Sequence, residues 1–283
     1  MSLLITPIEL AELQAGGAPV RLLDVRWRLD RPEGRPDYLA GHLPGAVYVD
    51  LDHELSRRGD PSEGRHPLPA RADLEAAAQR WGISPGDIVV VYDDVSSVAA
   101  SRAWWLLTRS GVADVRVLDG GLRAWTDAGG ALETSDVQPP RGTIELTAIQ
   151  DALTIDDAAA WPERGVLLDV RAPERYRGDV EPLDPVGGHI PGAVNLPTGT
   201  YLDAGRFRPP AELRAAFASA GATAGTPVAA YCGSGITAAH AVLAGRLAGI
   251  DVDIFPGSWS EWSNTRGRLV ATGSTPAGRV GPA

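Results

Sequence analysis

The single cysteine of the chain, Cys232, stands where a buried strand is expected to meet a helix. The apolar run Val228–Tyr231 before it has the length and residue types of a buried strand. Gly233 and Gly235 permit a tight loop, because glycine accepts backbone angles that a Cβ forbids. The residues A-A-H-A-V-L that follow the loop are good helix formers. The spacing therefore predicts a cysteine between the end of a strand and the start of a helix.

Such a loop favours a reactive sulfur. Successive backbone N–H groups in a tight loop form a nest that binds anions, and the start of a helix adds a partial positive charge. Both effects stabilise the thiolate, the form of cysteine that acts as a nucleophile. A buried structural cysteine would behave instead as a small hydrophobe, and the flanking glycines make that alternative the weaker one.

Composition restricts the function classes. A chain of 283 residues with one cysteine cannot form an internal disulfide, so it fits a reducing compartment, and we expect a cytoplasmic protein. We expect no signal peptide, and no apolar run reaches the length of a membrane span. The net charge of −10 argues against a nucleic-acid partner.

The charged residues also exclude several cofactor sites. The chain contains no lysine, which removes a phosphate-binding loop of the G-K-[ST] type and any lysine Schiff base. The five histidines are dispersed and the lone cysteine has no cysteine partner, so no zinc-binding spacing exists. We expect neither a metal nor a cofactor.

The chain carries an internal repeat in which four motifs return in the same order. Offsets of 137 to 147 residues indicate duplication of a whole domain rather than a short solenoid repeat. The matched pairs are Leu22–Trp27 with Leu167–Ala172, Ala40–Tyr48 with Gly187–Asn195, Val89–Asp93 with Val228–Cys232, and Gly120–Trp125 with Gly257–Trp262.

Each repeat alternates strands with helices, which predicts an α/β fold with a mostly parallel central sheet and helices on both faces. Active sites of such sheets lie at the carboxyl ends of strands, where Cys232 is expected. We predict domains at residues 1–132 and 148–283, with a proline-containing linker at 133–147 and a loosely held tail at 272–283. The expected helices and strands are Ile8–Ala15, Leu22–Val25, Ala70–Trp81, Val89–Tyr92, Ser101–Ser110 and Val115–Val117 in the first repeat, and Ile155–Trp161, Val166–Val170, Ala211–Ala220, Val228–Tyr231, Ala238–Ala248 and Val252–Ile254 in the second.

These motifs together resemble the two-domain rhodanese sulfurtransferases. The resemblance rests on D-V-R near the start of each repeat, G-H-[LI]-P-G-A in both, and one C-G-S-G-I-T loop in the second. It implies tandem rhodanese-like domains and an enzyme whose cysteine takes a sulfane sulfur from a small anionic donor. The cysteine holds that sulfur as a persulfide and passes it to an acceptor. The acceptors implied are cyanide, a thiol or a protein thiol such as that of a thioredoxin-like protein.

The loop sequence bears on the donor. Members that use thiosulfate resemble C-R-K-G-V-T, whereas members that use 3-mercaptopyruvate resemble C-G-S-G-[IV]-T. The loop Cys232–Thr237 follows the second pattern, with Gly233, Gly235, Ile236 and Thr237 as expected binding residues. Ser234 offers a hydroxyl that can donate to a carbonyl or relay a proton.

Two residues of the first repeat are implied by the same resemblance. In the mercaptopyruvate enzymes an aspartate and a histidine of the first half join the loop serine in a proton relay. The segments D-L-D and R-H-P-L-P place these at Asp52 and His66. The alternative is an ordinary surface aspartate and histidine in a long loop.

An arginine in the segment R-A-P-E-R-Y-R-G resembles the carboxylate clamp of the family. Position favours Arg175, whose planar fork can pair with a carboxylate through two bonds. Arg171 is the second candidate, although a structural ion pair with Asp169 is the preferred interpretation for it. The chain departs from the family where a second substrate arginine often stands, because Leu183 and Asp184 occupy that place.

Other matched residues are expected to be structural. His42 and His189 recur in both repeats, so we interpret both as residues that hold their turns. Asp93 occupies the cysteine position of the first repeat, and a carboxylate cannot hold a persulfide, so that repeat should be catalytically silent.

Three alternatives remain beside mercaptopyruvate sulfur transfer. One is thiosulfate as the donor on the same scaffold, and another is a non-catalytic module that binds or senses persulfides. A cysteine phosphatase is a poor fit, because C-x5-R would require arginine at position 238, which is alanine.

Overall fold

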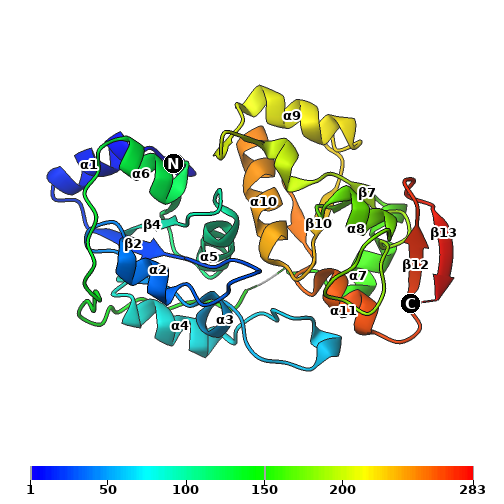
Figure 1. Cartoon of the computed structure of the whole chain (residues 1–283), viewed down its shortest axis with the longest axis horizontal. Helices are drawn as coiled ribbons and strands as arrows, with labels where there is room; N and C mark the ends of the chain where they lie inside the picture. Colours follow the sequence, from blue (N-terminus) through cyan, green and yellow to red (C-terminus); the bar gives the residue numbers. More distant parts are fainter. Residues whose placement is uncertain (1, 150, 283) are drawn as a thin grey trace. The chain divides into compact units, whose positions relative to one another are not determined.

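The computed structural model describes residues 2–149 and 151–282 and divides them into two compact units. Unit 1 comprises residues 2–57, 68–149 and 204–207, and unit 2 comprises residues 58–67, 151–203 and 208–282. Each unit therefore contains a short segment whose neighbours in the sequence belong to the other unit. Figure 1 shows the elements of both units in the colours of the sequence.

Unit 1 is built on a parallel five-stranded sheet in the order β1-β5-β4-β2-β3. The central strand β4 is apolar on both faces and buried from Val89 to Tyr92, as expected for a parallel sheet covered by helices, whereas β2 is buried only from Leu22 to Asp24. The strands are β1 (Leu4–Ile5), β2 (Val20–Asp24), β3 (Val47–Tyr48), β4 (Ile88–Tyr92) and β5 (Val115–Leu118). The helices are α1 (Pro7–Ala15), α2 (Arg35–Ala40), α3 (Leu51–Glu54), α4 (Arg71–Arg80), α5 (Val98–Arg109) and α6 (Gly121–Asp127).

Unit 2 repeats this arrangement with a parallel sheet in the order β11-β10-β6-β7. The order matches β5-β4-β2-β3 of unit 1, so the α/β fold with a mostly parallel sheet is confirmed. Its elements are η1 (Pro61–Glu63), α7 (Ile155–Ala160), η2 (Trp161–Glu163), β6 (Val166–Asp169), α8 (Pro173–Arg177), β7 (Val194–Asn195), η3 (Thr198–Tyr201), β8 (Leu202–Asp203), α9 (Pro210–Ser219), β10 (Val228–Tyr231), α10 (Ile236–Ala248), β11 (Asp253–Ile254), α11 (Ser258–Asn264), β12 (Leu269–Thr272) and β13 (Arg279–Pro282). The strand β9 (Arg206–Phe207) belongs to unit 1.

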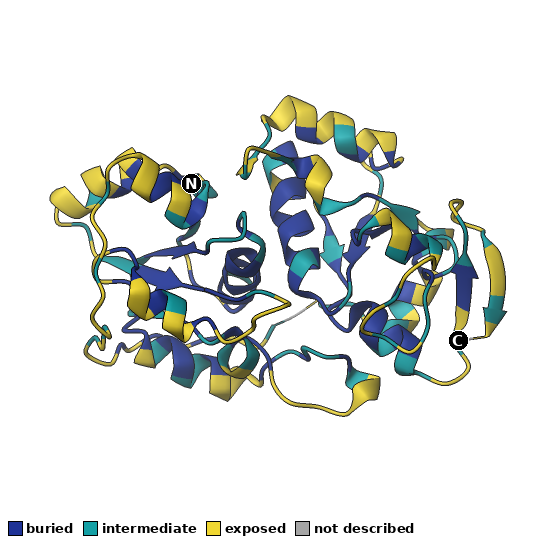
Figure 2. Ribbon diagram, viewed as in Figure 1, coloured by how far each residue is buried: buried dark blue, intermediate teal, exposed yellow. Residues whose placement is uncertain are grey.

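Burial follows the same plan in each unit. Figure 2 shows β2, β4 and β10 as buried, whereas the outer faces of α1, α4 and α9 are exposed. The helix α10 is buried along most of its length because its residues are small and apolar, and Gly245 lets it approach Val252 closely. A Cβ on Gly245 would lie 2.5 Å from a methyl carbon of Val252.

The two G-H-[LI]-P-G-A turns have the same internal contacts. His42 Nδ1 lies 2.8 Å from the carbonyl oxygen of Tyr38, and the two rings stack at 3.9 Å. His189 Nδ1 lies 2.8 Å from the carbonyl oxygen of Tyr176, and those rings stack at 3.8 Å. Both histidines are fully buried, so their contacts agree with a role in holding the turns.

Residues 133–147 form neither a helix nor a strand and are hydrogen-bonded to unit 1. The N–H of Gly142 donates to the carbonyl of Gln79 at 2.7 Å, and the N–H of Leu146 donates to Glu75 Oε2 at 2.8 Å. These bonds satisfy backbone groups that would otherwise need water. The proline-rich stretch is therefore fastened along its length to one unit.

The expectation of a loosely held tail is wrong. β12 pairs antiparallel with β13, so residues 279–282 form a strand and the Gly-, Pro- and Thr-rich stretch between them is a turn. The last matched pair of the repeat, Gly120–Trp125 and Gly257–Trp262, lies at the helices α6 and α11. Within the described residues, we find no helix that has both the length and the apolar character needed to span a membrane.

Candidate functional site

Cys232 follows the last residue of β10, the strand between β6 and β11 in unit 2. Its residue surface is 2% exposed. Gly235 ends the loop with φ of +82°, and a Cβ there would lie 2.3 Å from the carbonyl oxygen of Pro256, so glycine is required. Ile236 and Thr237 then open α10. The predicted loop between a buried strand and a helix is present.

The sulfur of Cys232 lies within reach of two groups. The backbone N–H of Gly235 donates to Sγ at 3.1 Å, which is the nest geometry expected for a thiolate. The hydroxyl of Ser258 lies 4.0 Å from Sγ and accepts the backbone N–H of Cys232 at 3.1 Å. That hydroxyl also donates to the carbonyl of Phe255 at 2.9 Å, which holds its oxygen beside the loop.

Ser258 was not identified from the sequence. It is fully buried and adopts φ of +55°, a left-handed conformation that a residue with a Cβ rarely takes. Strain of this kind is found where the surroundings enforce it, often at functional sites. The repeat carries a signal for it, because Gly121 occupies the matching position in the first repeat with φ of +58°.

Ser234 and His66 are hydrogen-bonded to each other in unit 2. Ser234 Oγ lies 2.8 Å from His66 Nδ1, although the two residues are 168 positions apart in the sequence. The segment Arg58–Pro67 that carries His66 belongs to unit 2. It is held there by the N–H of Arg65, which donates to Ser260 Oγ at 3.1 Å. The histidine is therefore brought to the loop by a piece of the first repeat.

Asp52 belongs to unit 1 and lies in α3. Its Oδ1 accepts the indole N–H of Trp27 at 2.9 Å. Of the three residues expected in the relay, Ser234 and His66 are hydrogen-bonded to each other in unit 2. Asp52 belongs to unit 1, where it is hydrogen-bonded to Trp27.

The two arginines considered for the clamp differ. Arg171 is 4% exposed, and its Nη2 pairs with Asp169 Oδ2 at 2.6 Å. In the first repeat Arg26 pairs with Asp24 at the same distance. Since the pair recurs in the repeat that lacks the cysteine, the contacts of Arg171 agree with the preferred structural interpretation.

Arg175 has no matching arginine in the first repeat. It precedes Tyr176 in α8, whereas Asp37 precedes the matching Tyr38. Its guanidinium pairs with Glu181 Oε1 at 2.7 Å and lies 3.6 Å from Asp184 Oδ2. Arg175 is therefore specific to the cysteine-containing repeat.

Arg65 and Asp184 are further residues of this cluster that the sequence did not identify as functional. Arg65 Nη1 forms an ion pair with Asp184 Oδ1, and the side chain of Asp184 is 1% exposed. Burial raises the pKa of Asp184 against the opposing charge of Arg65. The motif R-H-P-L-P contained the signal, because Arg65 directly precedes the histidine.

In the first repeat, the matching loop binds a carboxylate of the protein itself, that of Asp93. The carboxylate of Asp93 accepts the backbone N–H groups of Val95, Ser97 and Ala100, each at 2.9 Å. Burial raises the pKa of Asp93, and these hydrogen bonds oppose the rise. The loop before α5 is also one residue longer than the loop before α10, and Ser96 and Ser97 both take positive φ.

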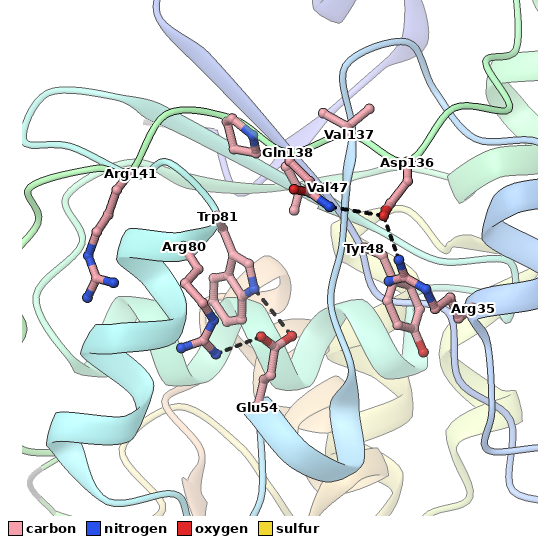
Figure 3. A pocket seen from close by; sticks show the side chains of 11 residues that line it. Arg35, Val47, Tyr48, Glu54, Arg80, Trp81, Asp136, Val137, Gln138 and Arg141 are labelled. Carbon is pink, nitrogen blue, oxygen red and sulfur yellow. Dashed lines mark hydrogen bonds and ion pairs between the residues drawn. The ribbon is translucent and has the colours of Figure 1, made fainter.

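A separate hollow of about 400 Å³ lies in unit 1 (Figure 3). Four of its charged side chains form ion pairs, Arg35 with Asp136 at 2.6 Å and Arg80 with Glu54 at 2.9 Å. Arg141, which also lines it, donates to Gln79 Oε1 at 2.9 Å. The described residues that line it include none of the predicted site residues. The chemistry-bearing residues of unit 2 are therefore the stronger candidate site.

A family model described as a rhodanese-like domain matches residues 6–128 and 154–265. A Mycobacterium tuberculosis protein named "Putative thiosulfate sulfurtransferase SseB" is 49% identical over 278 residues, covering 96% of this chain and 97% of that protein. A Pseudomonas aeruginosa protein named "Probable 3-mercaptopyruvate sulfurtransferase" is 44% identical over 266 residues, covering 89% and 92%.

A solved structure agrees with these matches. The crystal structure of SseA from Escherichia coli, described as a 3-mercaptopyruvate sulfurtransferase with the rhodanese fold, has a TM-score of 0.81. It is 29% identical, with 92% of this chain and 99% of that chain covered. The predicted family and the predicted fold are confirmed: the chain belongs to the rhodanese-like family and contains two copies of its domain.

Proposed function

We propose that this protein is a sulfurtransferase that moves a sulfane sulfur from 3-mercaptopyruvate to a thiophilic acceptor through a persulfide on Cys232. The observation that carries the proposal is the 2.8 Å contact between Ser234 Oγ and His66 Nδ1, in the loop that begins at Cys232. It joins a proton-transfer pair whose serine stands two residues after the nucleophile Cys232.

The chemistry balances without an external oxidant. The Cys232 thiolate attacks the sulfur of the donor, an S–S bond forms and the carbon–sulfur bond breaks. The electron pair of that bond goes to carbon and leaves as pyruvate enolate. The thiol proton of the donor passes to the enolate carbon, so the products are pyruvate and an ionised persulfide on Cys232.

The loop residues have separate roles in this step. The N–H of Gly235, 3.1 Å from Sγ, stabilises the attacking thiolate and then the persulfide. The Ser234 hydroxyl donates to the donor's carbonyl oxygen, which gains charge as the enolate leaves. His66 exchanges a proton with that hydroxyl, and Asp52 is the third member of the proposed relay. Arg175 binds the donor's carboxylate.

The two repeats have different roles in the proposed reaction. The first domain, residues 1–132, holds no persulfide of its own and contributes Asp52 and His66 to the relay, residues 133–147 are the linker, and residues 148–283 carry the persulfide. Its acceptor is cyanide, a thiol or a protein thiol such as that of a thioredoxin-like protein. The lone cysteine supports a reducing, cytoplasmic location, since it needs protection from oxidation to remain a thiolate.

Thiosulfate is the second candidate donor, favoured by the name of the Mycobacterium tuberculosis relative. Thiosulfate carries two negative charges and leaves as sulfite, so it needs cations around its sulfonate. Gly233 and Ser234 offer none from the loop itself. The residue types of the loop therefore support mercaptopyruvate as the preferred donor.

The test compares the two donors with purified protein. We expect kcat/KM to be higher for 3-mercaptopyruvate than for thiosulfate, with pyruvate released in step with sulfur transfer. Incubation with donor alone should add one sulfur atom to the peptide that contains Cys232, as measured by mass spectrometry. Cys232→Ser should keep the fold and lose all transfer, and measurable turnover in that variant would refute the proposal.

A further inference from the structure

Two guanidinium groups face the backbone beside Cys232. A Cβ built on Gly233 would lie 3.1 Å from Arg65 Nη2, and 3.5 and 3.7 Å from the two terminal nitrogens of Arg175. Gly233 directly follows the cysteine. A ligand attached to or approaching the sulfur along this side of the loop therefore meets both arginines.

The same pair of arginines already holds a carboxylate of the protein. Asp184 forms ion pairs with Arg65 through Oδ1 and with Arg175 through Oδ2, the second at 3.6 Å. Among the described residues, Oδ2 of Asp184 and Nε of Arg65 are buried without a hydrogen-bond partner. The two guanidiniums are thus arranged around a carboxylate, and the unpaired Nε–H of Arg65 is a buried donor that an incoming carboxylate can satisfy.

Of the three arginines near this loop, Arg65 has the fewest carboxylate partners and can therefore bind an anionic ligand most readily. Arg171 forms ion pairs with Asp169 and Glu181, and Arg175 also pairs with Glu181. Within the part of the chain that the structure describes, Arg65 forms an ion pair with Asp184 alone. Its side chain is 29% exposed, compared with 16% for Arg175 and 2% for Arg171.

Arg65 also faces open space. It lines a hollow of about 710 Å³ in unit 2, together with Arg58, Pro61, Leu183 and Asn264. A small anion can therefore reach the guanidinium from solvent. Arg65 therefore lines this hollow and also lies beside the backbone of Gly233.

We propose that Arg65, acting with Arg175, binds the carboxylate of the sulfur donor, and that Asp184 is the carboxylate that holds both guanidiniums in place until the donor arrives. This inference rests on the proposed function, because it assigns the substrate group that the site recognises. Since Arg65 precedes His66, one segment supplies both a proton-transfer group and a substrate cation.

The test uses the fact that the chain contains one cysteine. Iodoacetate and iodoacetamide alkylate the same sulfur and differ in that iodoacetate carries a carboxylate. The ratio of their rate constants at Cys232 measures attraction of a carboxylate to the loop. It requires no turnover of any donor, and the iodoacetamide rate is an internal control for access to the sulfur.

We expect Arg65→Ala to lower the iodoacetate-to-iodoacetamide ratio roughly tenfold or more, as for loss of a charge-assisted hydrogen bond. Arg65→Lys should recover part of the ratio, because an ammonium keeps the charge but lacks the planar fork. Arg177→Ala is the matched control, since Arg177 lies in α8 two residues from Arg175 and pairs with Asp179. Its ratio should equal that of the wild type.

The inference is overturned if Arg65→Ala leaves the ratio at the wild-type value. Failure of the proposed function has a different signature, namely no pyruvate released from 3-mercaptopyruvate by the wild-type protein. KM for 3-mercaptopyruvate should rise in Arg65→Ala by a larger factor than kcat falls, because the carboxylate is bound before and during the reaction.

Discussion

The N–H of Ser97 donates to Asp93 Oδ1 at 2.9 Å, in the place where the N–H of Gly235 donates to Cys232 Sγ in the second repeat. Each donor is the residue before its helix, and each has positive φ. The nest has thus been kept in both copies of the domain, with a fixed carboxylate in one and a nucleophilic sulfur in the other.

The first prediction concerns this carboxylate. Asp93→Ala removes the acceptor of three N–H groups, two of them in buried hydrogen bonds, so the free energy of unfolding should fall by roughly 2–4 kcal/mol. Urea-induced unfolding measures the change. The control is Asp127→Ala, because Asp127 is exposed and pairs weakly with Arg123 at 3.7 Å. Equal unfolding midpoints for the two variants would contradict the assignment of Asp93 as the anion that fills the nest.

The second prediction concerns the Ser234 hydroxyl. Ser234→Ala removes a donor to the developing enolate oxygen, so kcat with 3-mercaptopyruvate should fall by roughly ten- to a thousandfold. The persulfide should still form, since Cys232 and the N–H of Gly235 are unchanged. Stopped-flow measurement of pyruvate release gives the rate. A change in KM alone would show that the hydroxyl binds the ground state rather than the transition state.

The third prediction concerns the clamp. Arg175→Ala should reduce kcat/KM for an anionic donor by about 2–4 kcal/mol of transition-state stabilisation, because it removes the guanidinium that pairs with the donor's carboxylate, whereas Glu181 keeps its ion pair with Arg171. Arg175→Lys should recover only part of the loss. Steady-state kinetics on both variants and on Arg177→Ala measure the effect. If Arg175→Ala and Arg177→Ala behave alike, the donor's carboxylate is bound elsewhere.

The fourth prediction is a pH dependence of stability. Burial raises the pKa of Glu261 from 4.5 to about 7, with Arg268 opposing the rise and Glu63 adding to it. A carboxyl whose pKa is raised on folding stabilises the fold when protonated, and that contribution is lost as pH rises from 4.5 to 7. Glu261→Gln should therefore match the wild type near pH 4.5 and exceed its stability above pH 7.

The measurement is the free energy of unfolding of both proteins at several pH values. Glu261 lies in α11, which packs against η1 of the Arg58–Pro67 segment, so the difference reports on how firmly that segment is held. A constant difference between the two proteins across this range would contradict the prediction.

The loop around Cys232 was predictable because its signals are local. A buried strand, two glycines and a helix within a dozen residues determine one geometry, and the repeat supplied the rest of the fold. Arg65 was not predictable as a partner of Asp184, because 119 residues separate them and no periodicity relates a loop arginine to a distant carboxylate. Ser258 was missed because a serine at positive φ contradicts local preference and is imposed by its surroundings.

The pairing of Leu269–Thr272 with Arg279–Pro282 was also missed. Composition near the end of the chain favours a flexible tail, and only the partner strand shows otherwise. For Ser258 and for this strand pair, the conformation is determined by tertiary contacts, whereas the residue types alone predict a different local structure.

The exchange of segments 58–67 and 204–207 between the two units has a consequence for inheritance. A gene break within the linker would yield one product without Arg65 and His66 and another without residues 204–207. Recombination therefore cannot separate the two copies without damaging both. The first copy has Asp93 in place of a cysteine, and it nevertheless supplies unit 2 with the segment that carries Arg65 and His66.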